Sequence, residues 1–235
     1  MINIGAIIFS RMSSQRLPGK AMINLSGISL LERVIQQTSK VKNIEHICLA
    51  TSIDKSDDCL ESIAKKTGIE CYRGNRDNVA KRALEAAKKN GYDHFVRVCG
   101  DRPFIDPKVY ELMIKNHLNN NNDLTTNIFP RTVPPGLTCE IISTKSLERM
   151  YNMSLEKEDL EHVTRFIYNY PSEFKIQNIN FLFTKDEINL RLVIDNEIDL
   201  KRTQWVLDEM KINNKNNTET IISLTKEWTK FNKQI

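Results

Sequence analysis

The chain has 235 residues, of which 40% are hydrophobic and 27% are charged, and its formal net charge is +4. This size and composition fit one globular domain with its own core, and the mild positive charge, without a basic block or interleaved aromatic residues, indicates no nucleic-acid partner. No stretch reaches the roughly 20 apolar residues of a membrane span, and the N-terminal segment lacks the features of a signal peptide, so we expect a cytoplasmic protein with no membrane partner.

Strand and helix patterns alternate along the first half of the chain. Short apolar, β-rich runs predict four strands, at 3–9, 46–51, 69–72 and 94–101. Runs with apolar residues at helical spacing predict four helices, at 29–41, 57–68, 78–91 and 106–118. This β-α-β-α order predicts a mostly parallel sheet that is covered by helices on both faces.

The pattern loosens after residue 120. Residues 123–143 predict two strands around a proline-rich loop, and 158–171 predict a helix. A strand at 190–194, a turn and a helix to residue 210 follow, and then a final helix at 218–232. We interpret 1–235 as a single three-layer α/β/α domain with a mostly parallel, Rossmann-like sheet and a small β-rich excursion at 123–180.

The cysteines give no sign of disulfides or of a zinc site. They are odd in number and form no CxxC motif, and several lie in apolar runs. We therefore expect free, buried thiols in a reducing compartment. The five positions are Cys48, Cys59, Cys71, Cys99 and Cys139.

The loop after the first predicted strand has the character of an anion site. Arg11, Arg16 and Lys20 fall within ten residues, and three cations on one short loop match the charge of a polyphosphate. The small residues Ser13, Ser14 and Gly19 allow backbone N–H groups to approach a phosphate. The loop is neither a Walker A motif nor a Gly-x-Gly-x-x-Gly fingerprint. A solvated basic loop is the alternative interpretation.

Two acids follow later strands at the same predicted edge of the sheet. Asp101 stands after the flexible turn residue Gly100, and Asp195 directly follows the run at 190–194. Ligands of open α/β sheets bind beyond the carboxyl ends of the strands, and Mg²⁺ takes one or two carboxylates together with substrate phosphates. A Mg²⁺–polyphosphate site is therefore predicted, with Asp101 as a turn cap and Asp199 as a helix-dipole partner among the structural alternatives.

Seven segments follow one another along the chain: RMSSQRLPGK, ATSIDKSDD, YRGNRDNVAKR, VRVCGDRPFIDP, NIFPRTVPPGLTCEI, EHVTRFI and LRLVIDNEIDL. In this order they resemble the cytidylyltransferase family that includes the acylneuraminate and 3-deoxy-manno-octulosonate (KDO) cytidylyltransferases. The most similar branch is the spore-coat polysaccharide biosynthesis (SpsF) type, and the resemblance covers roughly residues 3–210. It implies a sheet of the nucleotide-diphospho-sugar transferase type.

The resemblance implies roles for individual residues. It makes Arg16, Lys20, Asp101 and Asp195 the catalytic set, with the two acids as metal ligands. Arg11 would join Arg16 and Lys20 on the phosphates of CTP. The remaining nucleotide-binding candidates are Ser13, Ser14, Ala50, Thr51, Ser52, Arg82 and Gly100. Candidates for the acceptor side are Arg131, Glu140, His162 and Arg165, of which the arginines are suited to a substrate carboxylate.

The chain departs from the family at several positions. Ser13 stands where the family usually has Gly, and Thr138 where the branch commonly has Asp, while Cys99 and Arg102 also differ from the usual residues beside the metal Asp. The phosphate and metal positions are kept and the acceptor positions are altered. Nucleotidyl transfer is therefore a firmer prediction than any particular sugar.

The implied reaction is attack by an acceptor oxygen on the α-phosphorus of CTP with release of pyrophosphate. Mg²⁺ is the expected cofactor, CTP and a small acidic sugar are the expected substrates, and a homodimer through 123–180 is the expected assembly. Another acceptor, such as a phosphonate or a sugar phosphate, or another nucleotide is one alternative. A glycosyltransferase is disfavoured because the segment around Asp101 lacks an Asp-x-Asp motif, and a nucleotide-binding module without turnover is the last alternative.

Overall fold

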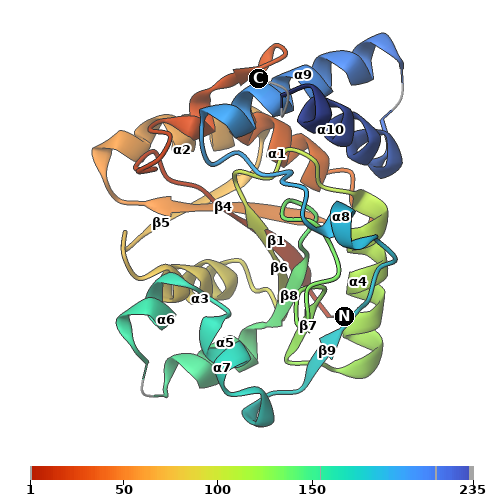
Figure 1. Cartoon of the computed structure of the whole chain (residues 1–235). Helices are drawn as coiled ribbons and strands as arrows, with labels where there is room; N and C mark the ends of the chain where they lie inside the picture. The colour runs from red at the N-terminus through yellow and green to blue at the C-terminus, as the bar shows by residue number, and fades with distance from the viewer. Residues whose placement is uncertain (1, 154, 215, 233–235) are drawn as a thin grey trace.

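A seven-stranded sheet runs through the centre of the protein in the order β5-β4-β1-β6-β8-β7-β9 (Figure 1). The structure is a computed structural model that describes residues 2–153, 155–214 and 216–232. β8 is antiparallel to both of its neighbours, and the other adjacent strands are parallel. The strands are β1 (Ile4–Phe9), β4 (His46–Ser52), β5 (Glu70–Gly74), β6 (His94–Cys99), β7 (Leu124–Thr126), β8 (Glu140–Ser143) and β9 (Ile176–Asn178), and a separate hairpin joins β2 (Asn24–Leu25) to β3 (Ile28–Ser29).

Helices cover both faces of this sheet, as the alternating pattern predicts (Figure 1). One face packs against α1 (Leu30–Thr38), α2 (Asp58–Thr67), α4 (Pro107–Asn120), α9 (Glu197–Ile212) and α10 (Thr218–Asn232). The other packs against α3 (Val79–Lys89), α5 (Thr144–Tyr151) and α7 (Arg165–Asn169). The short helices α6 (Lys157–Glu161) and α8 (Lys185–Ile188) complete the set, with 3-10 turns η1 (Lys20–Met22), η2 (Lys55–Asp57) and η3 (Pro171–Glu173).

The central strand β1 shows why the apolar runs form buried strands. Ala6 and Ile8 belong to the core under α1, whereas Ile7 belongs to the core under α3, and all three are fully buried. A strand that is buried on both faces has no polar side and therefore appears in the sequence as a continuous apolar run. The four strands and four helices predicted for the first half are confirmed, with ends that differ by a few residues.

The predicted strand at 190–194 is wrong. This segment forms no strand and pairs with turns instead, since Leu192 N–H donates to Pro135 O (2.7 Å) and Ile194 N–H donates to Asp101 O (3.0 Å). Leu192 and Ile194 are buried against these turns, so the segment has the apolar pattern of a strand without a place in the sheet. The second bond fixes Asp195 beside the end of β6.

The second half of the chain also differs in detail from the prediction. The helix predicted at 158–171 is divided into α6 and α7, since His162 leaves the helical conformation at φ −108° and ψ 89°. Residues 123–180 contribute β7, β8 and β9 to the main sheet and add the helices α5, α6 and α7. Two helices, α5 and α8, and the strand β9 were not predicted.

Two further sequence expectations concern the cysteines and the membrane. All five cysteines are free thiols, and Cys48 and Cys139 are the two that are fully enclosed. Among the helices of the described residues, none combines the length and the apolar character that crossing a membrane requires.

Candidate active site

A cavity of about 780 Å³ opens beyond the carboxyl ends of β1 and β6. Its walls come from the loop after β1, the segment before α3 and the start of that helix, the end of β6, the end of α6 and Asp195. Six cationic and four acidic side chains line it, and this excess of positive charge suits an anionic ligand. The ten are Arg11, Arg16, Lys20, Arg76, Arg82, Arg97, Asp77, Asp101, Glu161 and Asp195.

Lys20 lies at the centre of the charged groups. Its ammonium donates to Asp101 Oδ2 (2.9 Å), to Asp195 Oδ1 (3.1 Å) and to Ile194 O (2.9 Å). Arg16 reaches the same Asp195 carboxylate through Oδ2 at 3.1 Å. Burial disfavours the charged ammonium, but Asp101 and Asp195 outweigh it and hold the pKa of Lys20 above its usual value. The structure therefore brings together the three side chains that the sequence places beyond separate strands.

The loop after β1 is shaped by its own backbone and by one buried acid. Met12 O accepts from Ser14 N–H (2.9 Å) and from Gly19 N–H (3.0 Å), which folds the loop back on itself. Gly19 has φ 70°, a conformation that glycine adopts without strain, and it starts the turn that carries Lys20. Met12 N–H donates to the buried Asp57 carboxylate at 2.8 Å, so the loop is tied to the segment after β4.

The predicted nucleotide-binding residues at the end of β4 serve this tie. Thr51 Oγ1 (2.9 Å) and Ser52 Oγ (2.6 Å) both donate to Asp57 Oδ2, and Ala50 is buried in the core under α3. Burial would raise the pKa of Asp57, but the hydrogen bonds from Ser52, Met12 and Thr51 outweigh it and hold the pKa below its usual value. None of the residues Ala50, Thr51 and Ser52 lines the cavity.

Gly100 allows β1 and β6 to end in close contact. A Cβ at this position would lie 2.9 Å from both Cβ and Oγ of Ser10 and 3.0 Å from Phe9 O. Contacts this short would force the two strand ends apart.

The predicted nucleotide-binding residues Ser13 and Ser14 also line the cavity. Ser13 has no positive φ, so the side chain that replaces the family's usual glycine is not strained there.

Two arginines on the α3 side of the cavity are held by the turn before that helix. Arg82 is buried, and its Nη1 donates to Asn75 O (2.5 Å) and to Arg76 O (3.2 Å). Burial, with the nearby charge of Arg11, lowers the pKa of Arg82 to about 10. Arg11 donates to Arg76 O (2.8 Å) and pairs with Glu161 (3.3 Å), which lies in α6.

Most of the predicted acceptor-side residues lie away from the cavity wall. His162 lines it, but Arg165 is occupied by ion pairs with Asp159 (2.6 Å) and Glu158 (2.8 Å). Arg131 donates to Thr138 Oγ1 and to the carbonyl of Val133, both at 3.3 Å, and is not a lining residue.

The fourth predicted acceptor residue, Glu140, is buried behind the wall rather than on it. It accepts from Arg97 (2.5 Å), Thr164 (2.9 Å) and Tyr168 (2.8 Å). Sequence analysis missed Arg97, which does line the cavity, and also missed Arg76. A charged residue inside the apolar run HFVRVC is a signal that points to Arg97.

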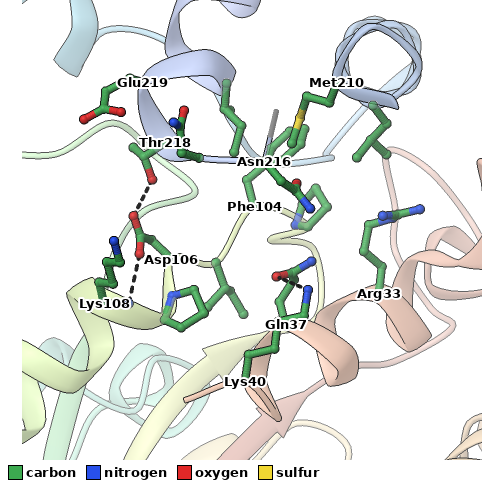
Figure 2. A pocket seen from close by; sticks show the side chains of 16 residues that line it. Arg33, Gln37, Lys40, Phe104, Asp106, Lys108, Met210, Asn216, Thr218 and Glu219 are labelled. Atoms are coloured by element: carbon green, nitrogen blue, oxygen red, sulfur yellow. Dashed lines mark hydrogen bonds between the residues drawn. The ribbon is translucent and has the colours of Figure 1, made fainter. Parts of the chain in front are cut away.

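A second cavity, of about 430 Å³, lies between α1, the loop before α4 and the adjoining ends of α9 and α10 (Figure 2). Asp106 sits at its edge, where it caps α4 by accepting from Lys108 N–H (2.9 Å) and also accepts from Thr218 Oγ1 (2.5 Å). This position therefore has a structural role, and none of the predicted catalytic or binding residues lines this cavity.

Comparison with known proteins identifies the family of this chain. A family model described as cytidylyltransferase matches residues 5–230. The chain is 31% identical over 204 residues to the spore coat polysaccharide biosynthesis protein SpsF of Bacillus subtilis, which covers 85% of this chain and 84% of that protein. It is 31% identical over 133 residues to the 3-deoxy-manno-octulosonate cytidylyltransferase of Chlorobaculum parvum, with 55% and 52% covered. A solved structure of a cytidylyltransferase from Leptospira borgpetersenii matches with a TM-score of 0.87 and 27% identity, over 99% of this chain and 96% of that one.

The mostly parallel sheet with a cation-lined cavity at its carboxyl edge, together with these matches, defines a nucleotidyltransferase. The family model spans almost the whole chain, and the chain belongs to the cytidylyltransferase family of CTP-dependent enzymes, as its seven segments predict. This sets aside the glycosyltransferase and the module without turnover.

Proposed function

We propose that the protein transfers the cytidylyl group of CTP to a small acidic sugar and releases pyrophosphate. The observation that carries the proposal is the convergence of Lys20, Asp101 and Asp195 in a cavity with an excess of cations. A triphosphate brings several negative charges to one place, and such a cavity offers it charge and donors. The SpsF and KDO relatives support a sugar acid as the acceptor and surface polysaccharide synthesis as the use of the product.

The cations of the loop after β1 would act on the phosphates. Arg11, Arg16 and Lys20 line one continuous wall, where they would bind the β- and γ-phosphates. As the bond to the α-phosphorus breaks, charge grows on the leaving pyrophosphate, and Arg16 and Lys20 would stabilise that charge. Arg82, fixed at the start of α3, would hold the nucleotide in position for in-line attack.

The carboxylates Asp101 and Asp195 would hold Mg²⁺. Both point at the Lys20 ammonium, so their oxygens already converge on one cation. They fit the ion, because Mg²⁺ prefers hard oxygen ligands and takes one or two carboxylates beside substrate phosphates. Within the described part of the chain, no group of three or more His, Cys, Asp or Glu side chains forms a separate metal cage. A bound Mg²⁺ supplies neutralisation of phosphate charge.

A pyrophosphate-release assay over a panel of nucleotides and acceptors tests the proposal. We expect turnover with CTP and 2-keto sugar acids, and little turnover with GTP, ATP or UTP. Preference for another nucleotide, or for a phosphonate or a sugar phosphate as acceptor, would favour the alternative within the same reaction class. Absence of pyrophosphate release with every combination would contradict the proposal.

We also propose that two chains associate through the 123–180 region. Two large apolar side chains of that region, Phe129 and Tyr170, are exposed on the single chain, and Leu182 is exposed just beyond it. Exposed apolar surface is typical of sites that bind a partner. Sedimentation velocity tests this: we expect a dimer whose dissociation constant rises when Phe129 and Tyr170 are both changed to serine.

A further inference from the structure

Arg97 is a charged residue in the middle of the buried strand β6. Its neighbours Val96 and Val98 point into the core under α1, α4 and α10, and Arg97 points to the opposite face, toward the active-site cavity. The side chain lines that cavity and is 19% exposed. Placing a guanidinium inside a buried strand is unfavourable unless it is paired, so its partners decide what it does.

The protein provides hydrogen-bond acceptors for only some of the N–H donors of Arg97. Nη1 donates to Glu140 Oε2 at 2.5 Å, whereas Nε is buried without a partner. In the described chain, no hydrogen bond from Nη2 is found. A guanidinium has five N–H donors, and the two on Nη2 can bind a carboxylate oxygen. Nη2 is therefore left for something other than the protein, whereas the buried Nε is not within reach of a ligand.

Glu140 holds Arg97 in this orientation. It lies opposite Arg97 in the register of β6 and β8, is buried, and accepts from Thr164 and Tyr168 as well. Burial would raise the pKa of Glu140, but the charges of Arg97 and Arg102 outweigh it and keep the pKa below its usual value. The ionised Glu140 cancels one of the two positive charges of Arg97 and Arg102. The net charge of +1 that remains suits a monoanion better than a phosphate.

Arg97 lines the cavity from β6 and is held by partners other than those of the nucleotide-binding cations. The loop after β1 and Arg82 line the cavity from β1 and α3. Arg97 instead pairs with Glu140 of β8, which also accepts from Thr164, two residues after His162. A nucleotide bound at the loop would leave the Arg97 side to the second substrate.

We propose that Arg97 binds the carboxylate of the acceptor sugar through Nη2, with Glu140 as the residue that positions it. This inference rests on the proposed function and names the group by which the second substrate is recognised. The sequence suggests Arg131 and Arg165 for binding the carboxylate, but Arg131 donates to Thr138 and Arg165 pairs with Asp159. Arg97 takes their place in this proposal.

The test compares wild type, Arg97→Met and Arg97→Lys with a panel of 2-keto sugar acids, their methyl esters and a sugar 1-phosphate. We expect wild type to prefer each acid to its ester, and Arg97→Met to lose that preference through a rise of about 10- to 100-fold in the KM for the acid. Arg97→Lys keeps the charge but not the fork, so it should lie between the two. The dissociation constant of CTP, measured separately, should change less than about 3-fold.

Arg149→Met is the matched control, because Arg149 is a half-exposed arginine outside the cavity that pairs with Asp123. It should leave every constant unchanged. A wild type that does not distinguish acids from esters, or an Arg97→Met variant that weakens CTP as much as the acid, would overturn the assignment of Arg97 while leaving cytidylyl transfer in place. Preferred turnover of the sugar 1-phosphate would also overturn it. No pyrophosphate release by wild type with any acceptor would remove the proposed function and this inference together.

Discussion

Lys20 and Asp101 stand 81 positions apart in the chain, and the Lys20 ammonium donates to the Asp101 carboxylate at 2.9 Å. The same ammonium contacts Asp195, so one side chain pairs with both acids that we propose as metal ligands. Lys20 thus holds a position between two carboxylates that a divalent cation would share. Binding of a metal-bound nucleotide would require Lys20 to exchange these carboxylates for phosphate oxygens.

Replacing Lys20 by methionine separates its pairing with the two carboxylates from its expected action on the leaving pyrophosphate. Without the ammonium, the two carboxylates repel each other, so we expect Mg²⁺ to bind the nucleotide-free protein about 10-fold more tightly. Turnover should fall about 100- to 1,000-fold with a much smaller change in CTP affinity, because the ammonium would act most strongly on the leaving group. Calorimetry and steady-state kinetics measure the two effects, with the exposed Lys42→Met as control. An unchanged kcat with a raised KM would contradict the role in the transition state.

The change Asp195→Asn keeps the shape of the side chain and removes its charge. We expect a loss of Mg²⁺-dependent turnover of at least about 1,000-fold, since the ion would lose one of its two carboxylates. Mg²⁺ should also stop raising the melting temperature of the variant, while the melting temperature without metal stays within about 5 °C of wild type. Asp186→Asn, an exposed acid of α8, is the control. Normal turnover of Asp195→Asn would remove this residue from the metal site.

A methyl group at Gly100 tests how closely the ends of β1 and β6 must approach. The added Cβ of Gly100→Ala meets Ser10 and Phe9 O at about 3 Å, and relief of these contacts shifts the adjoining Asp101. We expect turnover to fall about 10- to 100-fold and stability to fall by about 1–3 kcal/mol. Two of the three short contacts are made by Ser10. Adding Ser10→Gly to Gly100→Ala should therefore recover part of the activity, and no recovery would show that the loss has another cause.

Much of this site could be predicted because its parts follow strands. Periodicity identifies β1 and β6, and parallel topology brings the residues after them to one edge, so Lys20 and Asp101 are found without knowing any distance. Asp195 lies beside Lys20, as the sequence predicts, but the strand on which that prediction depended is absent. It follows an apolar run, but the run is fixed by the turns at Pro135 and Asp101 instead of by a neighbouring strand.

The unpredicted parts depend on contacts between distant side chains. Thr51 and Ser52 were assigned to the nucleotide, yet both hydroxyls bind Asp57, and nothing in their local pattern distinguishes these two uses. The sequence suggests Arg165 for a substrate carboxylate, but Arg165 forms ion pairs with three acids at and just after the start of α6. Arg97 was missed because the partner that it has among the described residues, Glu140, belongs to a strand 43 positions later.

The buried acid Asp57 makes the loop after β1 sensitive to acid. Its folded pKa lies below the ordinary 3.8, so its contribution to stability is complete above about pH 4 and is lost as the pH falls through the folded pKa. Asp57→Asn puts an amide NH₂ among donors from Met12, Thr51 and Ser52, and should cost about 1–3 kcal/mol at neutral pH.

Urea unfolding of wild type and Asp57→Asn at about pH 6 and about pH 3 measures this dependence. The difference in unfolding free energy between the two proteins should shrink as the pH falls, because protonation removes from wild type the same charge that the substitution removes. The exposed Asp186→Asn should show no such difference at either pH. A difference that stays constant between the two pH values would mean that the Asp57 carboxylate does not stabilise the loop through its charge, and that its hydrogen bonds act through geometry alone.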